Sequence, residues 1–520
     1  MRLDDLFAGR FGPDEAGPAF EGPVAGTRRV VDVDPAAVGM RRVGAAIDAS
    51  LRSDDGVGRR NIGVLSNHQV ETYLAVLGTV AAGHTFVPLN PKFPTERLTD
   101  IVTLGSVDVI LHDAGCREVL AALRAGGVGV PAVDVSTLVL EDADHQEVAA
   151  TRVWREEIGS RPLERDAIAY VMFTSGSTGV PKGVPISNGN LVSYVRQVTD
   201  LLGIERGLRF TQFFDLSFDL SMHDIFVCTN LGGTLIAPSA VDLMMPSGYV
   251  SRERIDVWFS VPILGAQLVR SKPAATFGGI LHMLFCGEAL PMETVIACRP
   301  WLRAGGDMWN LYGPTEATIA FTGACVTASP RQDGTASIGG PFGDNEVALL
   351  VDGEVISDPA IGVEGELLLG GPQVFGGYST DAPSPFVEAA GASWYRSGDL
   401  VHIDNDGVYF HGRLDSQVKY RGYRIELGDI EAAVRRTYDL KTVAVVLQGD
   451  RGDARLVAFH LAEESHDSLD AALLRTTLPA YMVPAEFVAL DVMPTNQNNK
   501  IDRRALAQWT PNAPGDGGSG

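Results

Sequence analysis

The sequence has few cysteines and no surplus of positive charge. Its five cysteines are scattered, odd in number and without a CxxC pair, which is typical of a reducing, cytoplasmic compartment. The chain carries 42 Lys and Arg against 65 Asp and Glu, a formal net charge of -23. A nucleic-acid partner is therefore not expected, because no basic surplus exists to neutralise phosphates. The opening residues MRLDDLFAGR lack an apolar stretch, so we expect no secretory signal.

One uncharged run, Thr72 to Pro91, is long enough to raise the question of a membrane span. It contains His84 and Asn90 together with several glycines and threonines, and it ends at a proline. This mixture predicts a buried helix and strand rather than a spanning helix. We therefore expect no membrane partner.

Apolar strand-like runs alternate with helical segments from Asn61 onward, which indicates the α/β class with a mostly parallel sheet. The segment from Ala336 to Tyr378 is richer in glycine and short β runs and predicts a smaller β subdomain. Near Arg413 the character changes to a separate small α+β unit of about 95 residues. We expect an N-terminal core over residues 1–412, a mobile C-terminal lid over residues 413–510 and a disordered tail over residues 511–520.

Several local expectations accompany this division. Residues 1–30 are rich in glycine and proline and are expected to be irregular. An amphipathic helix is expected over residues 43–51 and another helix over residues 469–478. The charged segment over residues 141–164 is interpreted as a surface connection.

The stretch from Tyr170 to Leu191, YVMFTSGSTGVPKGVPISNGNL, has the composition of a phosphate-binding loop after a buried strand. Its glycines allow positive φ and close approach of the backbone to a ligand, and successive free N–H groups form a nest for anions. Lys182 adds a point charge suited to phosphate. The pattern is not the common P-loop, so an ATP-like polyphosphate held by a different loop is expected. The residues concerned are Thr174, Ser175, Gly176, Ser177, Thr178, Gly179, Lys182 and Gly183.

Two carboxylates are placed to complete a nucleotide site. Glu316 follows the Gly313-Pro314 turn and is suited to Mg²⁺, which binds few protein oxygens plus phosphates. The alternative is a helix-start Glu favoured by the macrodipole. Asp399, in YRSGDL, could accept two hydrogen bonds from a ribose, or form an Asx-type turn. Tyr312 could stack on a base.

Two further stretches bear on movement and catalysis. Arg413 and Asp415 fall at the expected domain junction, where a backbone pivot is credible. Lys500 lies in a polar loop, where an exposed lysine is ordinarily only solvated.

Taken together, these stretches resemble the core motifs of the adenylate-forming superfamily, which includes acyl-CoA synthetases, firefly luciferases and the adenylation domains of nonribosomal peptide synthetases. The matching stretches are VPLNPKFP, TSGSTGVPKG, YGPTEAT, GELLLGG, YRSGDL, GRLDSQVKYRGYRIELGDIE and NNKIDR. The family usually has Gly before the last lysine, whereas Asn499 stands here, and Asn tolerates the left-handed conformation.

The resemblance implies a role for each matching residue. Glu316 would hold Mg²⁺, Asp415 would be the hinge, and Lys500 would reach the α-phosphate and the substrate carboxylate. Lys182 and Glu316 would be catalytic residues together with Lys500. The implied ATP-binding residues are Thr174, Ser175, Gly176, Ser177, Thr178, Gly179, Lys182, Asn310, Tyr312, Gly313, Thr315, Asp399 and Arg413.

The stretches FDLSFDLSMHDIF and FCGEALP look closest to the D-alanine–carrier-protein ligases and the small-amino-acid ligases of macrolactam biosynthesis. In amino-acid-activating members an Asp at the position of Asp219 binds the α-ammonium, and a buried carboxylate needs such a cation. The alternative is that Asp219 caps the following helix. The implied substrate residues are Asp219, Leu220, His223, Ile263, Leu284, Cys286, Gly287, Leu311, Ile319 and Ala320.

The resemblance implies a ligase that uses ATP and Mg²⁺ to convert a small amino acid, alanine favoured, to aminoacyl-AMP with release of pyrophosphate. The aminoacyl group would pass to the phosphopantetheine thiol of a separate carrier protein, since no carrier domain is expected after residue 510. The alternatives are an acyl-CoA synthetase acting on a small carboxylic acid or β-amino acid, and a non-catalytic module that retains the fold.

Overall fold

The structure is a computed structural model that describes residues 4–11, 15–24, 27–51, 58–67, 69–140, 144–160, 162–174, 181–271, 279–327, 329, 333–389, 391–415, 417–449, 453–464, 469–495 and 501–510. The described residues form two compact units. The first comprises residues of Met1–Pro91, Leu98–Thr174 and Lys182–Asp415, and the second comprises residues of Lys92–Arg97, Ser175–Pro181 and Ser416–Gly520. The boundary of the second unit falls after Asp415, and its mobility stays a prediction.

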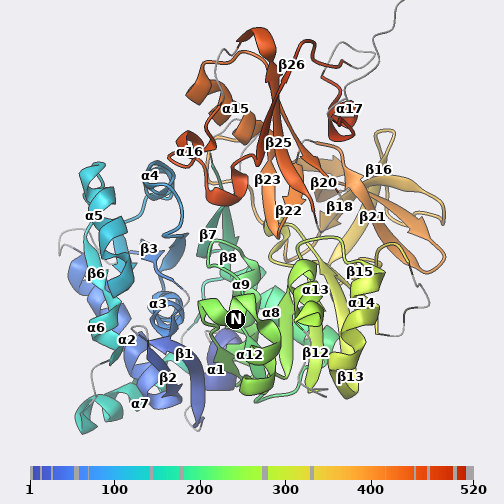
Figure 1. Ribbon diagram of the computed structural model, residues 1–520. Helices are drawn as coiled ribbons and strands as arrows, with labels where there is room; N and C mark the ends of the chain where they lie inside the picture. The colour runs from blue at the N-terminus through green and yellow to red at the C-terminus, as the bar shows by residue number, and fades with distance from the viewer. Residues whose placement is uncertain are drawn as a thin grey trace, which may run out of the picture. The chain divides into compact units, whose positions relative to one another are not determined.

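The first sheet of the large unit is parallel except at one edge, where the last two strands form an antiparallel pair. Helices against both faces of a parallel sheet explain why its strands are nearly uniformly apolar. In spatial order the strands are β6 (Ala132–Asp134), β5 (Val109–His112), β3 (Asn61–Leu65), β4 (Thr85–Leu89), β7 (Ile168–Thr174) and β8 (Lys182–Ser187). The helices of this part are α1 (Asp4–Phe11), α2 (Val33–Ser50), α3 (Val70–Ala81), α4 (Thr95–Leu104), α5 (Arg117–Ala125), α6 (Val135–Leu140) and α7 (His145–Ser160) (Figure 1).

The second sheet of the same unit has a parallel centre and antiparallel edges. In spatial order its strands are β15 (Gly340–Pro341), β14 (Thr322–Cys325), β13 (Leu302–Tyr312), β12 (Ile280–Phe285), β11 (Val257–Ser260), β9 (Arg209–Thr211), β10 (Thr234–Ile236), β1 (Pro18–Val24) and β2 (Thr27–Asp32). The helix α8 (Asn188–Leu202) connects β8 of the first sheet to β9 of this one. The helices between the strands of the second sheet are α9 (Leu220–Met222), α10 (Cys228–Asn230), α11 (Ala240–Met244), α12 (Pro246–Glu253), α13 (Pro262–Arg270) and α14 (Met292–Cys298).

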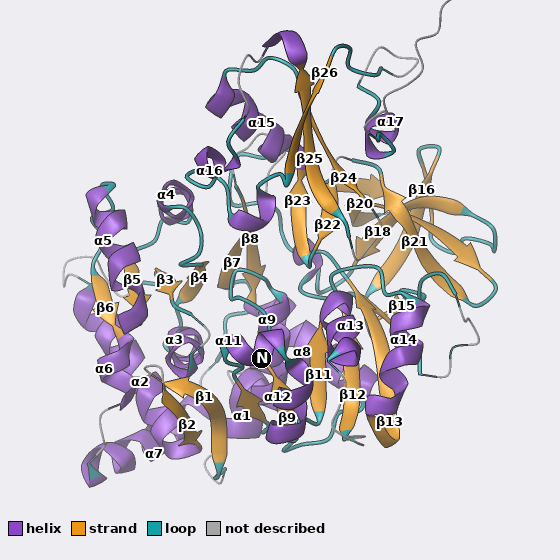
Figure 2. Cartoon of the chain, viewed as in Figure 1, coloured by secondary structure: helices purple, strands orange, loops and turns teal. Residues whose placement is uncertain are grey.

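The predicted β subdomain is a third, antiparallel sheet whose strands lie side by side and are joined by loops (Figure 2). Its strands are β16 (Glu346–Val351), β17 (Glu354–Ile356), β18 (Glu364–Gly370), β19 (Phe386–Ala389), β20 (Ala392–Asp404) and β21 (Gly407–Arg413). Apolar side chains from all three sheets join one buried core in this unit.

The small unit has its own apolar core, centred on α15 and the sheet that it contacts. Its elements are β22 (Gln417–Tyr420), β23 (Tyr423–Glu426), α15 (Leu427–Tyr438), β24 (Val443–Gln448), β25 (Arg455–Leu461), α16 (Ala471–Leu474), β26 (Glu486–Leu490) and α17 (Arg503–Ala507). No helix within the described ranges is both long and apolar enough to cross a membrane.

Two local expectations about the start of the chain are wrong. Residues 1–30 are not irregular, because they contain α1, β1 and β2, and β1 pairs in parallel with β10 far along the chain. The helix expected over residues 43–51 begins ten residues earlier, at Val33. The composition of the first segment gives no sign of its remote partner.

Two later expectations also need correction. The charged segment over residues 141–164 contains the helix α7, which packs on α2 through buried Thr151 and Arg155. The helix expected over residues 469–478 stops at Leu474, and the hydroxyls of Thr476 and Thr477 donate to the backbone carbonyls of Leu473 and Leu474. Such local side-chain bonds compete with helix continuation.

Candidate active site

The phosphate-loop candidate sits between two paired strands. Thr174 ends β7 and lies opposite Lys182, the first residue of β8, in antiparallel register. The intervening candidates Ser175, Gly176, Ser177, Thr178 and Gly179 lie outside the described residues. The strand β8 then leads into α8, whose N-terminus is closed by a capping box between Ser187 and Asn190. The two ends of the loop are thus held side by side.

Gly183 is required for a close approach rather than for positive φ. It lies in β8, and a Cβ there would overlap the hydroxyl of Ser379. The backbone N–H of Ser379 donates to the Gly183 carbonyl at 2.9 Å, and the Gly183 N–H donates to Thr380 Oγ1 at 3.3 Å. The segment after Gly377 therefore packs directly against the start of β8.

Tyr378 links two of the predicted residues and was not singled out by the sequence. Its hydroxyl donates to Glu316 Oε1 at 2.9 Å, and its ring lies 5.5 Å from Lys182 Nζ. Glu316 is 1% exposed and lies in the short 3-10 turn Thr315–Ala317. The structure thus brings Lys182 and Glu316 together on either side of one tyrosine.

Glu316 is the candidate ligand for Mg²⁺. Among the described residues, no group of three or more His, Cys, Asp or Glu is arranged to hold a metal ion. A buried carboxylate nevertheless fits Mg²⁺, which takes one or two protein carboxylates and completes its shell with substrate phosphates and water.

A second network joins Tyr312, Asp399, Arg413 and Asp415. The Tyr312 hydroxyl donates to Asp399 Oδ2 at 2.5 Å, and Arg413 Nη1 donates to Asp399 Oδ1 at 2.5 Å. Arg413 also makes a two-point contact with Asp415, with both distances at 2.7 Å. Burial raises the pKa of Tyr312, and the Asp399 charge raises it further. The guanidinium of Arg413 therefore connects Asp399, the residue predicted to bind the ribose, to Asp415, the predicted hinge.

Gly398 makes room for this guanidinium. Its φ is +70°, and a Cβ there would lie 2.8 Å from Arg413 Nη2. The carboxylate of Asp399 is 2% exposed on its side chain, yet each carboxylate oxygen has a second lone pair for a further donor. The Asx-turn alternative does not describe Asp399, which lies within β20 opposite Arg413.

Asn310 presents a buried amide at the end of β13. Its Nδ2 donates to the Ser337 carbonyl at 2.8 Å, which fixes the orientation of the amide. Its Oδ1 is buried and has no hydrogen-bond partner among the described residues. Gly313 follows in a tight turn, where a Cβ would lie 2.7 Å from the Ala320 Cα. Asn310 therefore offers one acceptor to a donor such as an exocyclic amine.

Asp219 lies at the start of α9 but does not cap it, since its carboxylate makes no capping hydrogen bond. It is 8% exposed and faces buried tyrosines. Burial raises the pKa of Tyr170, and the Asp219 charge raises it further. Burial also raises the pKa of Tyr194, and the Asp219 charge raises it further. The buried carboxylate of Asp219 thus lies near two neutral tyrosine hydroxyls.

His223 is fully buried beside the same tyrosine. Its Nδ1 shares a hydrogen bond with the Tyr194 hydroxyl at 2.6 Å, and its ring lies 4.3 Å from that of Phe259. Burial lowers the pKa of His223 to about 3, so the ring is neutral at pH 7. It starts a π-helical turn, His223–Val227, a rare form frequent at functional sites.

Most of the remaining pocket candidates are apolar residues of the buried core. Gly287 has φ +90°, and a Cβ there would lie 3.2 Å from Val261 and 3.4 Å from Leu220. Ile263 lies half-buried in the first turn of α13. The candidates that share the buried core of this unit are Leu220, Leu284, Cys286, Leu311, Ile319 and Ala320.

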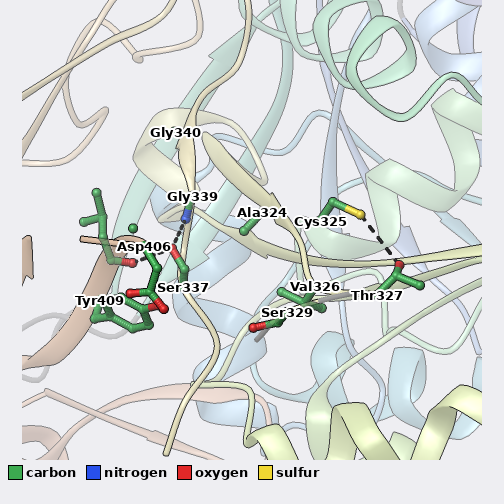
Figure 3. A pocket seen from close by; sticks show the side chains of 12 residues that line it. Ala324, Cys325, Val326, Thr327, Ser329, Ser337, Gly339, Gly340, Asp406 and Tyr409 are labelled. Carbon is green, nitrogen blue, oxygen red and sulfur yellow. Dashed lines mark hydrogen bonds between the residues drawn. The ribbon is translucent and has the colours of Figure 1, made fainter. Parts of the chain in front are cut away.

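Lys500 lies outside the described residues, so its role stays a prediction. A separate cavity of about 500 Å³ lies between β14 and the β20–β21 hairpin, with Cys325 near Thr327 on one side and Ser337 on the other (Figure 3). Its lining includes none of the candidate site residues.

Comparison with known proteins gives consistent results. The family described as AMP-binding enzyme matches residues 45–379. The chain is 32% identical over 458 residues to a phosphinothricin tripeptide synthetase of Streptomyces viridochromogenes, covering 86% of this chain but only 40% of that protein. It thus spans less than half the length of the peptide synthetases that it matches. It is also 32% identical over 457 residues to a D-alanine–D-alanyl carrier protein ligase of Lacticaseibacillus rhamnosus, covering 83% of this chain and 85% of the ligase.

Among solved structures, the chain is similar to the Vibrio cholerae adenylation domain AlmE in complex with glycyl-adenosine-5'-phosphate. The TM-score is 0.82 at 27% sequence identity, covering 97% of this chain and 96% of that one. The expected fold class, with α/β subdomains and a smaller β subdomain in a large N-terminal part, is thereby confirmed.

Proposed function

This chain belongs to the AMP-binding enzyme family of adenylate-forming enzymes, and from that premise we propose that it activates a small amino acid. The product is an aminoacyl-adenylate, with alanine the first candidate, and the aminoacyl group then passes to the phosphopantetheine thiol of a separate carrier protein. The observation that carries the proposal is the buried carboxylate of Asp219, whose charge acts on the buried hydroxyls of Tyr170 and Tyr194. The α-ammonium of an amino acid would supply a favourable opposite charge to this carboxylate.

The nucleotide is assigned to the network at the end of β13 and β20. Asn310 offers a buried acceptor to the adenine amine, Tyr312 packs on the base, and Asp399 accepts from the ribose hydroxyls with Arg413 behind it. Gly313 and Thr315 supply the turn that leads to Glu316. These assignments rest on burial and hydrogen bonding together with the family motifs.

The phosphates are assigned to the loop between Thr174 and Lys182, with Glu316 holding Mg²⁺. When bound, Mg²⁺ neutralises charge on the phosphate oxygens. Lys182 contributes a second positive charge from its position over the Tyr378 ring. Tyr378 orients the Glu316 carboxylate through its hydroxyl.

In the proposed first step, a carboxylate oxygen of the amino acid bonds to the α-phosphorus of ATP, and the bond to the pyrophosphate oxygen breaks. Negative charge develops between two anions, where a fixed cation lowers the barrier. We assign that cation to Lys500, supplied by the second unit. In the second step the carrier thiol loses its proton and attacks the acyl carbon, and AMP leaves. Asp415 is the proposed pivot between the two steps.

ATP–pyrophosphate exchange tests the first step with glycine, alanine, serine, valine, β-alanine, a fatty acid and an aryl acid. We expect exchange with the small α-amino acids and its loss, by 100-fold or more, in Asp219→Asn, which keeps the shape but removes the charge. Removing one partner of a buried ion pair costs several kcal/mol, which corresponds to about a hundredfold or more in binding. Exchange driven only by fatty or aryl acids, and unaffected by Asp219→Asn, contradicts the proposal and favours an acyl-CoA synthetase. We also propose a cytoplasmic location, as the number and spacing of the cysteines in the sequence indicate.

A further inference from the structure

The wall of the proposed amino-acid pocket contains two strained residues in succession. Thr318 has φ +59° and Ile319 has φ +71°. A β-branched residue in this region is an outlier, and Thr and Ile are both β-branched. Such a conformation persists where the surrounding structure enforces it, and it is frequent at functional sites. Something must therefore hold the backbone of this turn.

Gln373 is the side chain that holds it. It is fully buried, and its Nε2 donates to three carbonyls of the turn, those of Ala317 at 3.3 Å, Thr318 at 3.4 Å and Ala320 at 2.8 Å. The Thr318 hydroxyl returns a hydrogen bond to the Gln373 carbonyl at 2.6 Å. The turn is thus bound to Gln373 through both backbone and side chain.

The amide of Gln373 is itself fixed in one orientation. Its Oε1 accepts from Asn345 Nδ2 at 2.8 Å and from Gln197 Nε2 at 3.2 Å. Gln197 Oε1 in turn accepts from the Asp344 backbone N–H at 2.6 Å. Because both donors converge on Oε1, Nε2 must face the carbonyls. Both polar atoms of the Gln373 amide are thus hydrogen-bonded, whereas the buried Asn345 Oδ1 has no hydrogen-bond partner among the described residues.

The backbone that Gln373 holds belongs to residues of the proposed pocket. Ile319 and Ala320 are proposed pocket residues, and Glu316 lies in the preceding 3-10 turn, where its carbonyl accepts from the Phe375 N–H at 2.9 Å. We propose that Gln373 is a positioning residue for amino-acid selection: it fixes the backbone from Thr318 to Ala320, so that the wall stays closed against side chains larger than that of the native substrate. The inference rests on the proposed function of the same pocket.

The test measures selectivity in ATP–pyrophosphate exchange with alanine, 2-aminobutyrate and valine. Gln373→Met keeps the volume and removes the donors. We expect the ratio of kcat/KM for alanine over valine to fall about tenfold or more, and KM for alanine to rise more than KM for ATP. The reason is that each buried carbonyl that loses its donor destabilises the native conformation of the turn. The ratio does not depend on the fraction of enzyme that is folded, so it separates loss of wall geometry from loss of stability.

A matched control removes comparable hydrogen bonds far from the pocket. Arg155→Met deletes donors to the Phe11 and Glu15 carbonyls, at 3.2 and 3.1 Å, and to the Asp34 carboxylate, at 2.6 Å, and should leave the ratio unchanged. Where Gln373→Met does not fold, Asn345→Ala removes one donor to Oε1 and should shift the ratio in the same direction by a smaller factor. An unchanged ratio in the variants that fold overturns the inference. Failure of the wild-type enzyme to activate any amino acid overturns the proposed function instead.

Discussion

Gly398→Ala tests whether Arg413 must stay where the structure places it. The new Cβ would lie 2.8 Å from Arg413 Nη2 and 3.3 Å from Asp415 Oδ2, so the guanidinium must move. Gly398 also has φ +70°, which costs an alanine about 1–2 kcal/mol. Both effects lower the free energy of unfolding, but only the displacement of Arg413 changes the proposed nucleotide site.

The magnitude follows from the contact between Arg413 and Asp399. Their side chains are 9% and 2% exposed, and a hydrogen bond to a charged partner contributes about 1.5–3 kcal/mol. If ATP binds with Asp399 held by Arg413, KM for ATP should rise about 10- to 150-fold. The contact with Asp415 counts for less, because that carboxylate is 44% exposed and is screened by solvent.

A matched variant separates backbone strain from displacement. Gly353 has φ +88°, and a Cβ added there would meet no atom within 4 Å, so Gly353→Ala carries the strain alone. The assay is ATP–pyrophosphate exchange at varied ATP, with urea unfolding of each variant alongside. Equal KM values for ATP in the two variants would refute the assignment of Arg413 to the nucleotide site.

Two further predictions concern the phosphate side and the buried histidine. Tyr378→Phe keeps the ring beside Lys182 but removes the hydroxyl that donates to Glu316. Because a hydrogen bond to a carboxylate is lost, we expect kcat for exchange to fall about tenfold or more and the Mg²⁺ concentration needed for activity to rise. An unchanged Mg²⁺ dependence would show that Tyr378 does not orient the Mg²⁺ ligand. Burial lowers the pKa of His223 from 6.5 to about 3. Below about pH 6.5 the unfolded chain therefore binds a proton at this histidine that the folded chain does not bind. The free energy of unfolding should then fall by about 1.4 kcal/mol for each pH unit below about 6.5. His223→Leu should therefore flatten the pH dependence of urea unfolding between pH 6.5 and 4, and an identical slope in wild type and variant would show that His223 is protonated in the folded state.

The sequence predicts the parts of the fold that local patterns encode. Apolar strands such as Asn61–Leu65 can be located because neighbouring residues determine them. The motif residues Glu316 and Asp399 stand out for the same reason. The surroundings of a motif residue cannot be predicted in the same way. The Asx-turn interpretation of Asp399 and the capping interpretation of Asp219 could be tested only against the positions of their side chains.

Contacts between distant segments could not be predicted. Tyr378 reaches Glu316 across 62 residues, and Gln373 reaches Ala320 across 53. A buried glutamine or tyrosine carries no local signature, because its partners are backbone carbonyls or side chains from another strand. The helix α7 was missed because its sequence is polar on most sides and resembles a surface connection.

The pairing of the first strand with β10 has a consequence for the order of events during synthesis. Arg10 donates to the Gly232 carbonyl across 222 residues of chain, and Phe20 lies opposite Leu235. At the usual pace of translation the opening segment leaves the ribosome roughly 10 to 45 s before its partner exists. During that interval β1 can already pair with β2 and Phe20 can stack on Tyr73, but the edge of β1 that pairs with β10 has no native partner. A nascent chain that stops short of β10 therefore exposes an unpaired strand edge, which is a template for association with other chains.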